Sequence, residues 1–254
     1  MSMRIKKSSI SGSFYSNDEK ILRNELKYIE GNGIKTPAII VPHAGHIYSG
    51  KIAGEAYKKI SNEYDKVILL APNHTVYTKK AVLDTNDLWE TPLGEVKLWK
   101  PEIKNEAFSE NEIVHKQEHA AEVQIPFLQI KLKNFKVLPI IIGDINEVDL
   151  NKITKELLKL IDKNTLLIIS TDLSHFLSER DAREEDEETI KNILKIKDVH
   201  PDSACGANPL KVANRIFKEL NLEPKFLKYA TSKDVTGDKN NVVGYASFIT
   251  EKKK

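Results

Sequence analysis

Histidines follow directly after several apolar runs of strand length. These are His43 after residues 38–41, His74 after residues 66–70, and His175 after residues 166–169. Because the ends of neighbouring parallel strands lie at one edge of a sheet, we expect these side chains to converge. Imidazole suits zinc, copper and iron. The pattern therefore predicts a metal or catalytic site at that edge, with His43 and His74 as favoured ligands.

Acidic residues accompany two of the candidate histidines. Asp172 lies three residues before His175 and could orient it as a general acid or base, although an aspartate there could also cap a helix. His119 stands beside Glu118, with Glu122 one turn on. Helical spacing predicts that the two glutamates share a face and that His119 points away from it. For His119, a pocket role and a solvated helix end both remain open.

Cys205 is the one cysteine of the chain. A lone cysteine is usually a small buried hydrophobe. Beside a metal it becomes a thiolate ligand, and two histidines with one thiolate leave coordination positions open. As a nucleophile, Cys205 would instead need His175 or His119 as its base.

Three further histidines carry weaker expectations. His46 could line the pocket without binding metal, whereas His115 and His200 are predicted to lie at the surface. The acidic run at residues 179–188 is typical of a solvated helix face.

Composition excludes several classes of function. The 39 basic and 37 acidic residues nearly balance, which gives no electrostatic reason to expect nucleic acid or a membrane surface as partner. One cysteine permits no intramolecular disulfide, so a cytoplasmic location is the default. Residues 1–16 have no signal-peptide core, and no apolar run approaches the length of a membrane span. Dinucleotide-binding, P-loop and C-x-x-C motifs are absent.

Strand and helix patterns alternate along the chain. The expected strands are 38–41, 66–70, 137–142, 166–169, 225–230 and 242–249, with an extended segment at 10–15 and a hairpin pairing 82–83 with 96–99 around a turn at 91–94. The expected helices are 20–29, 49–61, 118–130 (restarting at Pro126), 150–161, 198–204 and 209–220. This alternation predicts one α/β domain over residues 1–254, with a mixed, mostly parallel sheet.

A set of short motifs, in order over nearly the whole chain, resembles the Memo family. They are Ser-Gly-Ser-Phe-Tyr at 11–15, Pro-His-Ala-Gly at 42–45, Pro-Asn-His at 72–74, Thr-Pro-Leu-Gly at 91–94, Glu-His-Ala-Ala-Glu-Val-Gln-Ile-Pro at 118–126, Ser-Thr-Asp-Leu-Ser-His at 170–175, Cys-Gly at 205–206 and Val-Val-Gly-Tyr-Ala at 242–246. The resemblance implies a three-layer α/β/α sandwich similar to class III extradiol dioxygenases, which use non-haem iron.

The same resemblance implies a site and partners. His43, His74 and Cys205 match positions that bind copper or iron in the family, and the thiolate favours copper over the carboxylate-bound iron of the dioxygenases. Asp172, His175 and His119 match positions lining the same pocket. We therefore expect a metal-dependent redox enzyme, with a small molecule or peptide in the pocket and a radical-SAM protein as a possible partner. The alternatives are a non-catalytic metal- or peptide-binding scaffold, and a cysteine hydrolase using Cys205.

Overall fold

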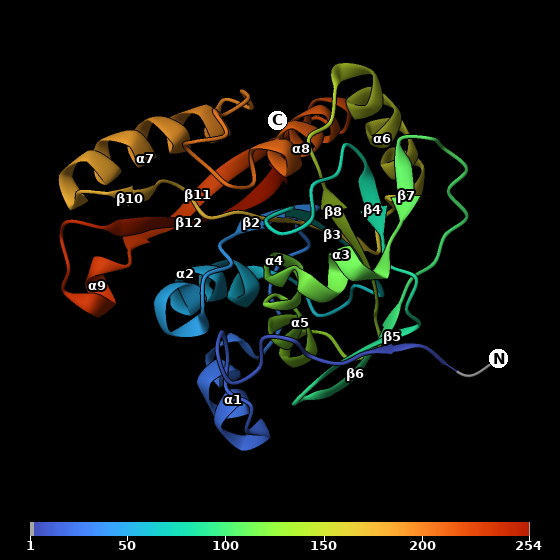
Figure 1. Ribbon diagram of the computed structural model, residues 1–254, viewed down its shortest axis with the longest axis horizontal. Helices are drawn as coiled ribbons and strands as arrows, with labels where there is room; N and C mark the ends of the chain where they lie inside the picture. Colours follow the sequence, from blue (N-terminus) through green and yellow to red (C-terminus); the bar gives the residue numbers. More distant parts are fainter. Residues whose placement is uncertain (1–2, 254) are drawn as a thin grey trace.

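A twisted sheet forms the middle layer of the molecule, with helices on both faces (Figure 1). The structure is a computed structural model that describes residues 3–253. This is the α/β class with the three-layer arrangement that the sequence predicts. No helix in this described range combines the length and apolar character needed to span a bilayer.

Four parallel strands form the centre of the sheet, in the order β8-β3-β9-β2. Beyond β2 the sheet continues antiparallel with β12, and β12 pairs with β11 and β10. On the other side β8 pairs with β6, and β6 with β5. The strands of residues 3–253 are β1 (Ile5–Lys6), β2 (Ala38–Val41), β3 (Lys66–Pro72), β4 (Ala81–Leu83), β5 (Leu88–Thr91), β6 (Gly94–Leu98), β7 (Phe108–Glu110), β8 (Lys136–Ile142), β9 (Thr165–Ser170), β10 (His175–Leu177), β11 (Leu222–Thr231) and β12 (Val242–Lys252).

The central strands form because they are apolar on both faces, as buried parallel strands require. In β3, Val67 and Leu69 face one hydrophobic core, while Ile68 and Leu70 face the other. This alternation gives the sheet two apolar faces, and each must be covered by helices.

Helices cover the two faces in separate groups. Leu26 of α1, Tyr57 of α2 and Phe127 of α5 belong to the first core. Leu157 of α6 and Phe217 of α8 belong to the second. The helices of the described chain are α1 (Glu19–Leu26), the 3-10 turn η1 (Lys27–Ile29), α2 (His46–Lys59), α3 (Glu112–Gln117), α4 (His119–Glu122), α5 (Ile125–Lys131), α6 (Glu147–Leu160), α7 (Glu179–Leu194), α8 (Ala207–Glu219) and α9 (Lys233–Thr236).

The segment at residues 10–15 is a compact turn, so its predicted extended form is wrong. The Gly12 amide donates to the Tyr15 carbonyl at 2.7 Å, and Gly12 has a φ of +83°. Glycine adopts that left-handed conformation without the strain that a Cβ would cause. The turn places Ser13 and Phe14 next to the start of α2, where the His46 amide donates to the Phe14 carbonyl at 2.7 Å.

Three other expectations are corrected by the structure. Residues 198–204 form turns and coil rather than a helix. The hairpin around 91–94 joins β5 to β6, whereas β4, which holds residues 82–83, pairs with β7 and β8. Helix α2 begins at His46, three residues before the predicted start, because Gly45 with its extended backbone already serves as the N-cap. The restart near Pro126 is confirmed, since α4 and α5 are separate helices.

Candidate metal centre

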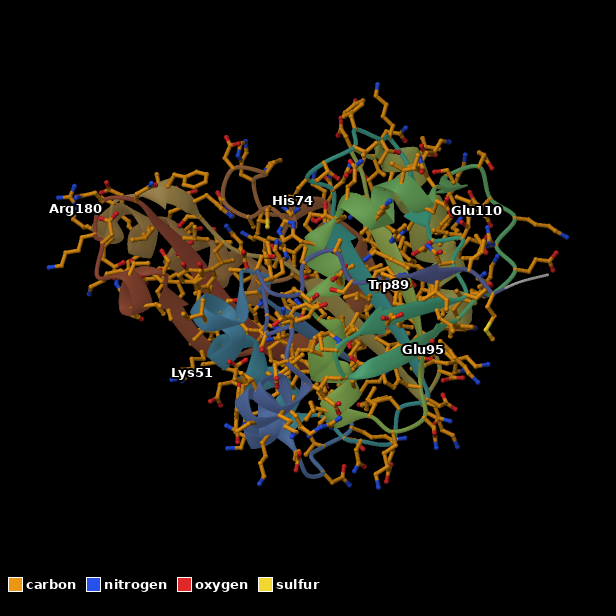
Figure 2. The ribbon with its side chains drawn as sticks, turned by 60° about the horizontal axis from the view of Figure 1, so that its bottom comes forward. Lys51, His74, Trp89, Glu95, Glu110 and Arg180 are labelled. Carbon is orange, nitrogen blue, oxygen red and sulfur yellow. The ribbon has the colours of Figure 1, made fainter. Side chains whose placement is uncertain are left out.

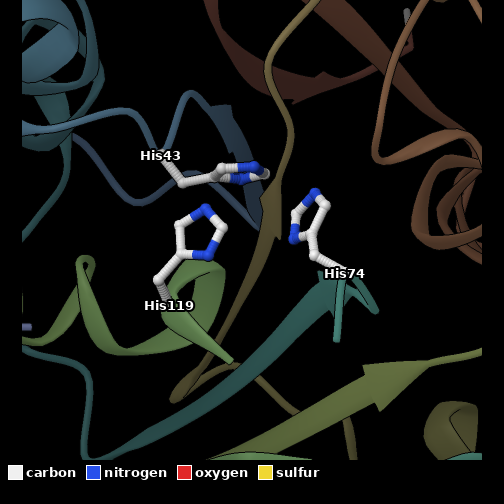
Figure 3. Close-up of side chains that lie close together, drawn as sticks. All are labelled: His43, His74 and His119. Carbon is white, nitrogen blue, oxygen red and sulfur yellow. The ribbon is translucent and has the colours of Figure 1, made fainter. Parts of the chain in front are cut away.

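Three histidines from distant parts of the chain lie together beyond the ends of the central strands. His43 follows β2, His74 follows β3, and His119 opens α4. One ring nitrogen of each lies within 4.8 Å of the others, and Figure 3 shows the rings turned toward a common space. Figure 2 places His74 near the middle of the molecule, away from the charged side chains labelled at its periphery. The predicted convergence of His43 and His74 is confirmed.

His43 is fully enclosed, and its neighbours determine which ring nitrogen carries the proton. The Ser170 hydroxyl donates to the Ala120 carbonyl at 2.7 Å, so its oxygen can only accept from His43 Nδ1, 2.9 Å away. Nδ1 is therefore protonated, and Nε2 carries a lone pair. Burial, followed by the nearby His74, His119 and His175, lowers the pKa of His43 and keeps it neutral. A neutral imidazole with a free Nε2 is the form that binds metal.

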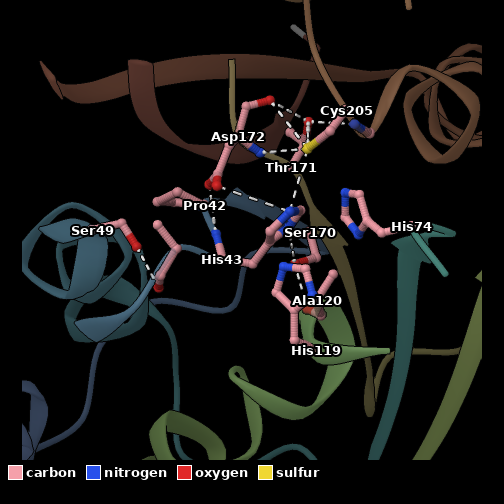
Figure 4. Close-up of polar contacts among 12 residues, drawn as sticks. Pro42, His43, Ser49, His74, His119, Ala120, Ser170, Thr171, Asp172 and Cys205 are labelled. Carbon is pink, nitrogen blue, oxygen red and sulfur yellow. Dashed lines mark hydrogen bonds and ion pairs between the residues drawn. The ribbon is translucent and has the colours of Figure 1, made fainter. Parts of the chain in front are cut away.

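Cys205 lies directly against His43, with its Sγ 3.3 Å from His43 Nε2. The Asp172 amide donates to the same sulfur at 3.2 Å. In Figure 4, Cys205 and Asp172 lie on one side of His43, with Ala120 and His119 on the other. Burial, reinforced by the Asp172 carboxylate, raises the pKa of the Cys205 thiol. In the absence of a bound cation the sulfur is a thiol, which disfavours the cysteine hydrolase.

Asp172 faces His43 rather than His175. Its Oδ1 accepts from the His43 amide at 2.7 Å, and its Oδ2 lies 3.9 Å from His43 Nε2. Burial raises the pKa of Asp172 to about 7, against the backbone amides of His43 and Ala44, which lower it. His175 bonds instead to the Leu173 carbonyl, and burial lowers its pKa. The structure shows no bond by which Asp172 would orient His175.

A cavity of about 430 Å³ reaches the cluster at His119. Its walls include His119, Asp172 and His175, whereas His43, His74 and Cys205, expected to share a pocket with them, are not among its lining residues. Three aromatic side chains, those of Phe14, Tyr48 and Tyr245, contribute to the rest, together with small and hydroxyl-bearing residues. A concave site that combines aromatic side chains with a few polar groups suits a small molecule.

Glu118 and Glu122 do not share a face, so that prediction is wrong. Glu118 is the N-cap of α4 with extended backbone, and helical spacing does not apply to it. Its carboxylate contacts His74 and His119. Glu122, within the helix, is directed to the N-terminal segment, where it pairs with Lys6.

The remaining histidines lie outside the cluster. His46 Nε2 bonds to the Val123 carbonyl at 3.1 Å, and the ring lines a second cavity between α1 and α2. His115 is fully buried, contrary to its predicted place at the surface, because its Nε2 bonds to the Val82 carbonyl and its ring packs beside Trp89. His200 is exposed, as predicted.

The fold and the cluster together define an α/β protein with a histidine-rich pocket at the end of its central strands. Comparison with known proteins gives the family. The family described as "Memo-like protein" matches residues 6–249. The chain belongs to the Memo family.

Relatives from bacteria and archaea match over nearly their whole length. A "MEMO1 family protein" of Aquifex aeolicus is 36% identical, over 97% of this chain and 99% of the relative. Proteins with the same description from Methanosarcina mazei and Metallosphaera sedula are 34% and 33% identical. These two alignments cover 98% and 93% of this chain, respectively, and 100% and 96% of the relatives. The family expectation drawn from the short motifs is therefore confirmed.

Proposed function

We propose that the protein binds a redox-active metal, iron or copper, through His43 and His74, with Cys205 and His119 as the remaining protein ligands. The observation that carries the proposal is the group of three ring nitrogens within 4.8 Å of one another. Cys205 is not a member of that group of three, but its Sγ approaches His43 Nε2 to 3.3 Å.

The donors fit such an ion in number and type. Two ligand atoms bound tetrahedrally at 2.0–2.1 Å lie roughly 3.3 Å from each other. The three ring nitrogens lie within 4.8 Å of one another and would move closer together to hold one ion. His43 Nε2 carries no proton, and its lone pair faces Cys205 Sγ at 3.3 Å, close to that tetrahedral separation. Imidazole together with thiolate selects copper, iron or zinc over calcium and magnesium.

The ion would supply one-electron chemistry or activation of a small molecule such as oxygen. This chain's residues would bind and orient a substrate in the adjoining cavity, against the rings of Phe14, Tyr48 and Tyr245. His175 lines that cavity, and its lowered pKa keeps it neutral and able to accept a proton near pH 7. Asp172 would hold the loop that carries His43 through its bond to the His43 amide.

The substrate class supported best is a small molecule, because a chamber of about 430 Å³ accommodates few residues of a peptide. A peptide ligand and a radical-SAM partner protein remain proposals that rest on the family. A cytoplasmic location is proposed from the single cysteine.

Metal content tests the proposal most directly. Anaerobically purified protein should contain nearly one equivalent of iron or copper, or take it up on titration with Fe(II) or Cu(I). His74→Ala and Cys205→Ser should lose it, whereas His200→Ala, which changes an exposed histidine, should retain it. Absence of uptake by the wild type would overturn the proposal, and equal uptake by all variants would overturn the ligand set.

A further inference from the structure

We propose that the second cavity, between α1 and α2, is a binding site for a small uncharged molecule with an apolar body. This site lies apart from the histidine cluster and needs no metal. The inference therefore goes beyond the proposed function, and metal-free protein is sufficient to test it.

The second cavity is larger than the chamber that reaches His119. Its volume is about 770 Å³, against about 430 Å³ for the chamber. Small-molecule sites generally have volumes of about 300–1,000 Å³. Helices α1 and α2 cover the same face of the sheet (Figure 1), and the turn at residues 12–16 adds a further wall. The size and the three walls suit a single organic molecule.

Large apolar side chains from several elements line the second cavity. Tyr15 and Leu26 are buried, but three others remain exposed to solvent around the same hollow. These are Ile21 of α1 at 54%, Tyr28 of η1 at 41% and Ile47 of α2 at 72%. Single exposed apolar side chains are common, whereas a group of them around one hollow is typical of a binding groove. A ligand with an apolar body would remove all three from water.

Two glycines of α2 shape the wall of the second cavity. The Tyr28 hydroxyl donates to the Gly50 carbonyl at 2.9 Å. The same hydroxyl occupies the place of a side chain on Gly54, where a Cβ would lie 1.9 Å from its oxygen. Gly50 itself lines the hollow without filling it. Since glycine inside a helix is destabilising relative to alanine, these two positions serve to fix Tyr28 and to leave space along α2.

The charged residues of the lining balance one another. Glu25 and Glu55 are acidic, and Lys51 and Lys228 are basic. Glu55 and Lys228 lie 3.9 Å apart and pair with each other, while Lys51 lies near the edge of the molecule (Figure 2). The lining therefore offers no surplus charge to an ionic ligand, and burying an unpaired ion against its apolar walls would be unfavourable. An uncharged ligand is the complementary one.

The length of the second cavity favours a small molecule over a partner helix. Its lining follows α2 from His46 to Glu55, which is roughly 14 Å along the helix axis. The N-terminal turn lies at the first end, where the His46 amide donates to the Phe14 carbonyl at 2.7 Å. The pair of Glu55 and Lys228 lies at the other end. A partner helix would have to continue past these ends, whereas a molecule of a few linked rings fits between them.

A neutral fluorescent probe tests the site. N-phenyl-1-naphthylamine, titrated into metal-free protein, should gain fluorescence and saturate at one equivalent. Ile21→Glu and Ile47→Glu should each weaken binding about tenfold or more, because each places a carboxylate against the apolar probe. Both side chains are exposed, so the variants should fold, which circular dichroism checks. Ile113→Glu is the matched control, since Ile113 is 55% exposed on α3 and lies outside the cavity. It should bind like the wild type.

Two further comparisons fix the place and the class of the ligand. Tyr48→Ser alters the chamber that reaches His119 and leaves the lining of the second cavity intact, so it should bind the probe like the wild type. The anionic analogue 8-anilinonaphthalene-1-sulfonate should bind about tenfold more weakly than the neutral probe. Absence of saturable binding, or equal binding by Ile47→Glu, would overturn the site. Weaker binding by Tyr48→Ser would place the probe in the chamber and also overturn it, and equal affinity for the sulfonate would overturn the uncharged class.

Sedimentation velocity tests whether a second copy of the chain covers the hollow instead. The wild type and Ile47→Glu should sediment alike. Self-association of the wild type that Ile47→Glu abolishes would overturn the small-molecule site. The outcome is separate from that of the metal titration: a protein that binds the probe but takes up no iron or copper would retain this site and lose the proposed function.

Discussion

Ser170 connects three segments of the site through a single hydroxyl group. It is completely buried at the end of β9. Its Oγ accepts from His43 Nδ1 at 2.9 Å and from Gln124 Nε2 at 3.0 Å, and donates to the Ala120 carbonyl at 2.7 Å. Every bonding direction of the hydroxyl is thereby used, which fixes the ring of His43.

We predict that Ser170→Ala lowers the free energy of unfolding by about 1–3 kcal/mol, because buried partners lose their bonds. Denaturant unfolding measures the effect. Ser247→Ala is the control, since Ser247 is equally buried but its Oγ has no hydrogen-bond partner. That variant should be nearly neutral, and an equal loss in both variants would contradict the assigned network.

The position of a site residue could be predicted only where the neighbouring sequence determines it. His43 and His74 were found because each stands directly after an apolar strand, and strand order then brings them together. Glu118 was misplaced because its extended backbone as an N-cap breaks the helical spacing on which the prediction relied. His115 was misplaced because the buried side of the short helix α3 depends on Trp89, a residue of a distant strand.

The N-terminal segment is held to the molecule by Glu122. This glutamate of α4 is only 1% exposed and has partners on both sides of the segment's turn. The donors are Lys6 Nζ, Ser8 Oγ, the Ser9 amide and hydroxyl, the Ile10 amide and Tyr15 Oη. This turn places the ring of Phe14 against the ring of His119, with centroids 4.8 Å apart. A local sequence pattern could not reveal this turn, because its partner lies more than a hundred residues further along the chain.

Glu122 should make stability depend on pH. Burial works to raise its pKa, but the charge and hydrogen bond of Lys6, with the bonds of Ser8 and Ser9, outweigh it and leave the pKa lowered. The unfolded chain therefore binds a proton more readily than the folded one. The stabilisation is complete above the ordinary glutamate pKa of about 4.3 and is lost as the pH falls toward the folded value.

We predict that Glu122→Gln is less stable than the wild type at pH 7, and that the difference shrinks on acidification through this window. Urea unfolding of both proteins at a series of pH values measures it. Glu19→Gln is the control, because Glu19 forms an exposed pair with Arg23 that should contribute little. A stability difference that stays constant with pH would contradict the role given to Glu122.

Two hydrophobic cores share one sheet, so the whole molecule should unfold as one unit. Phe217 lies in the core beneath α8, and Trp89 in the core on the opposite face. We predict that Phe217→Ala costs about 3–5 kcal/mol and shifts the unfolding seen by Trp89 as much as that seen by far-UV circular dichroism. A Trp99→Phe background restricts the emission to Trp89.

A Trp89 transition that stays in place while the circular dichroism transition shifts would contradict unfolding as one unit, and with it the prediction of one domain over residues 1–254.

The fold class and the central strands could be predicted because runs such as residues 137–142 are apolar at nearly every position, which only a strand covered on both faces satisfies. The pairing of β4 with β7 and β8 could not be predicted, because the sequence of a three-residue strand is too short to specify which strand lies next to it.

The candidate ligands come from four separate segments, and His43 and Cys205 are 162 residues apart in the chain. An ion held by them would bind only the folded protein and would close long loops of chain as a cross-link does. By mass action, free metal at 100 times its dissociation constant would add about 2.7 kcal/mol to the free energy of unfolding. Metal supply would then determine how long the protein survives proteolysis, whether or not the site turns over a substrate.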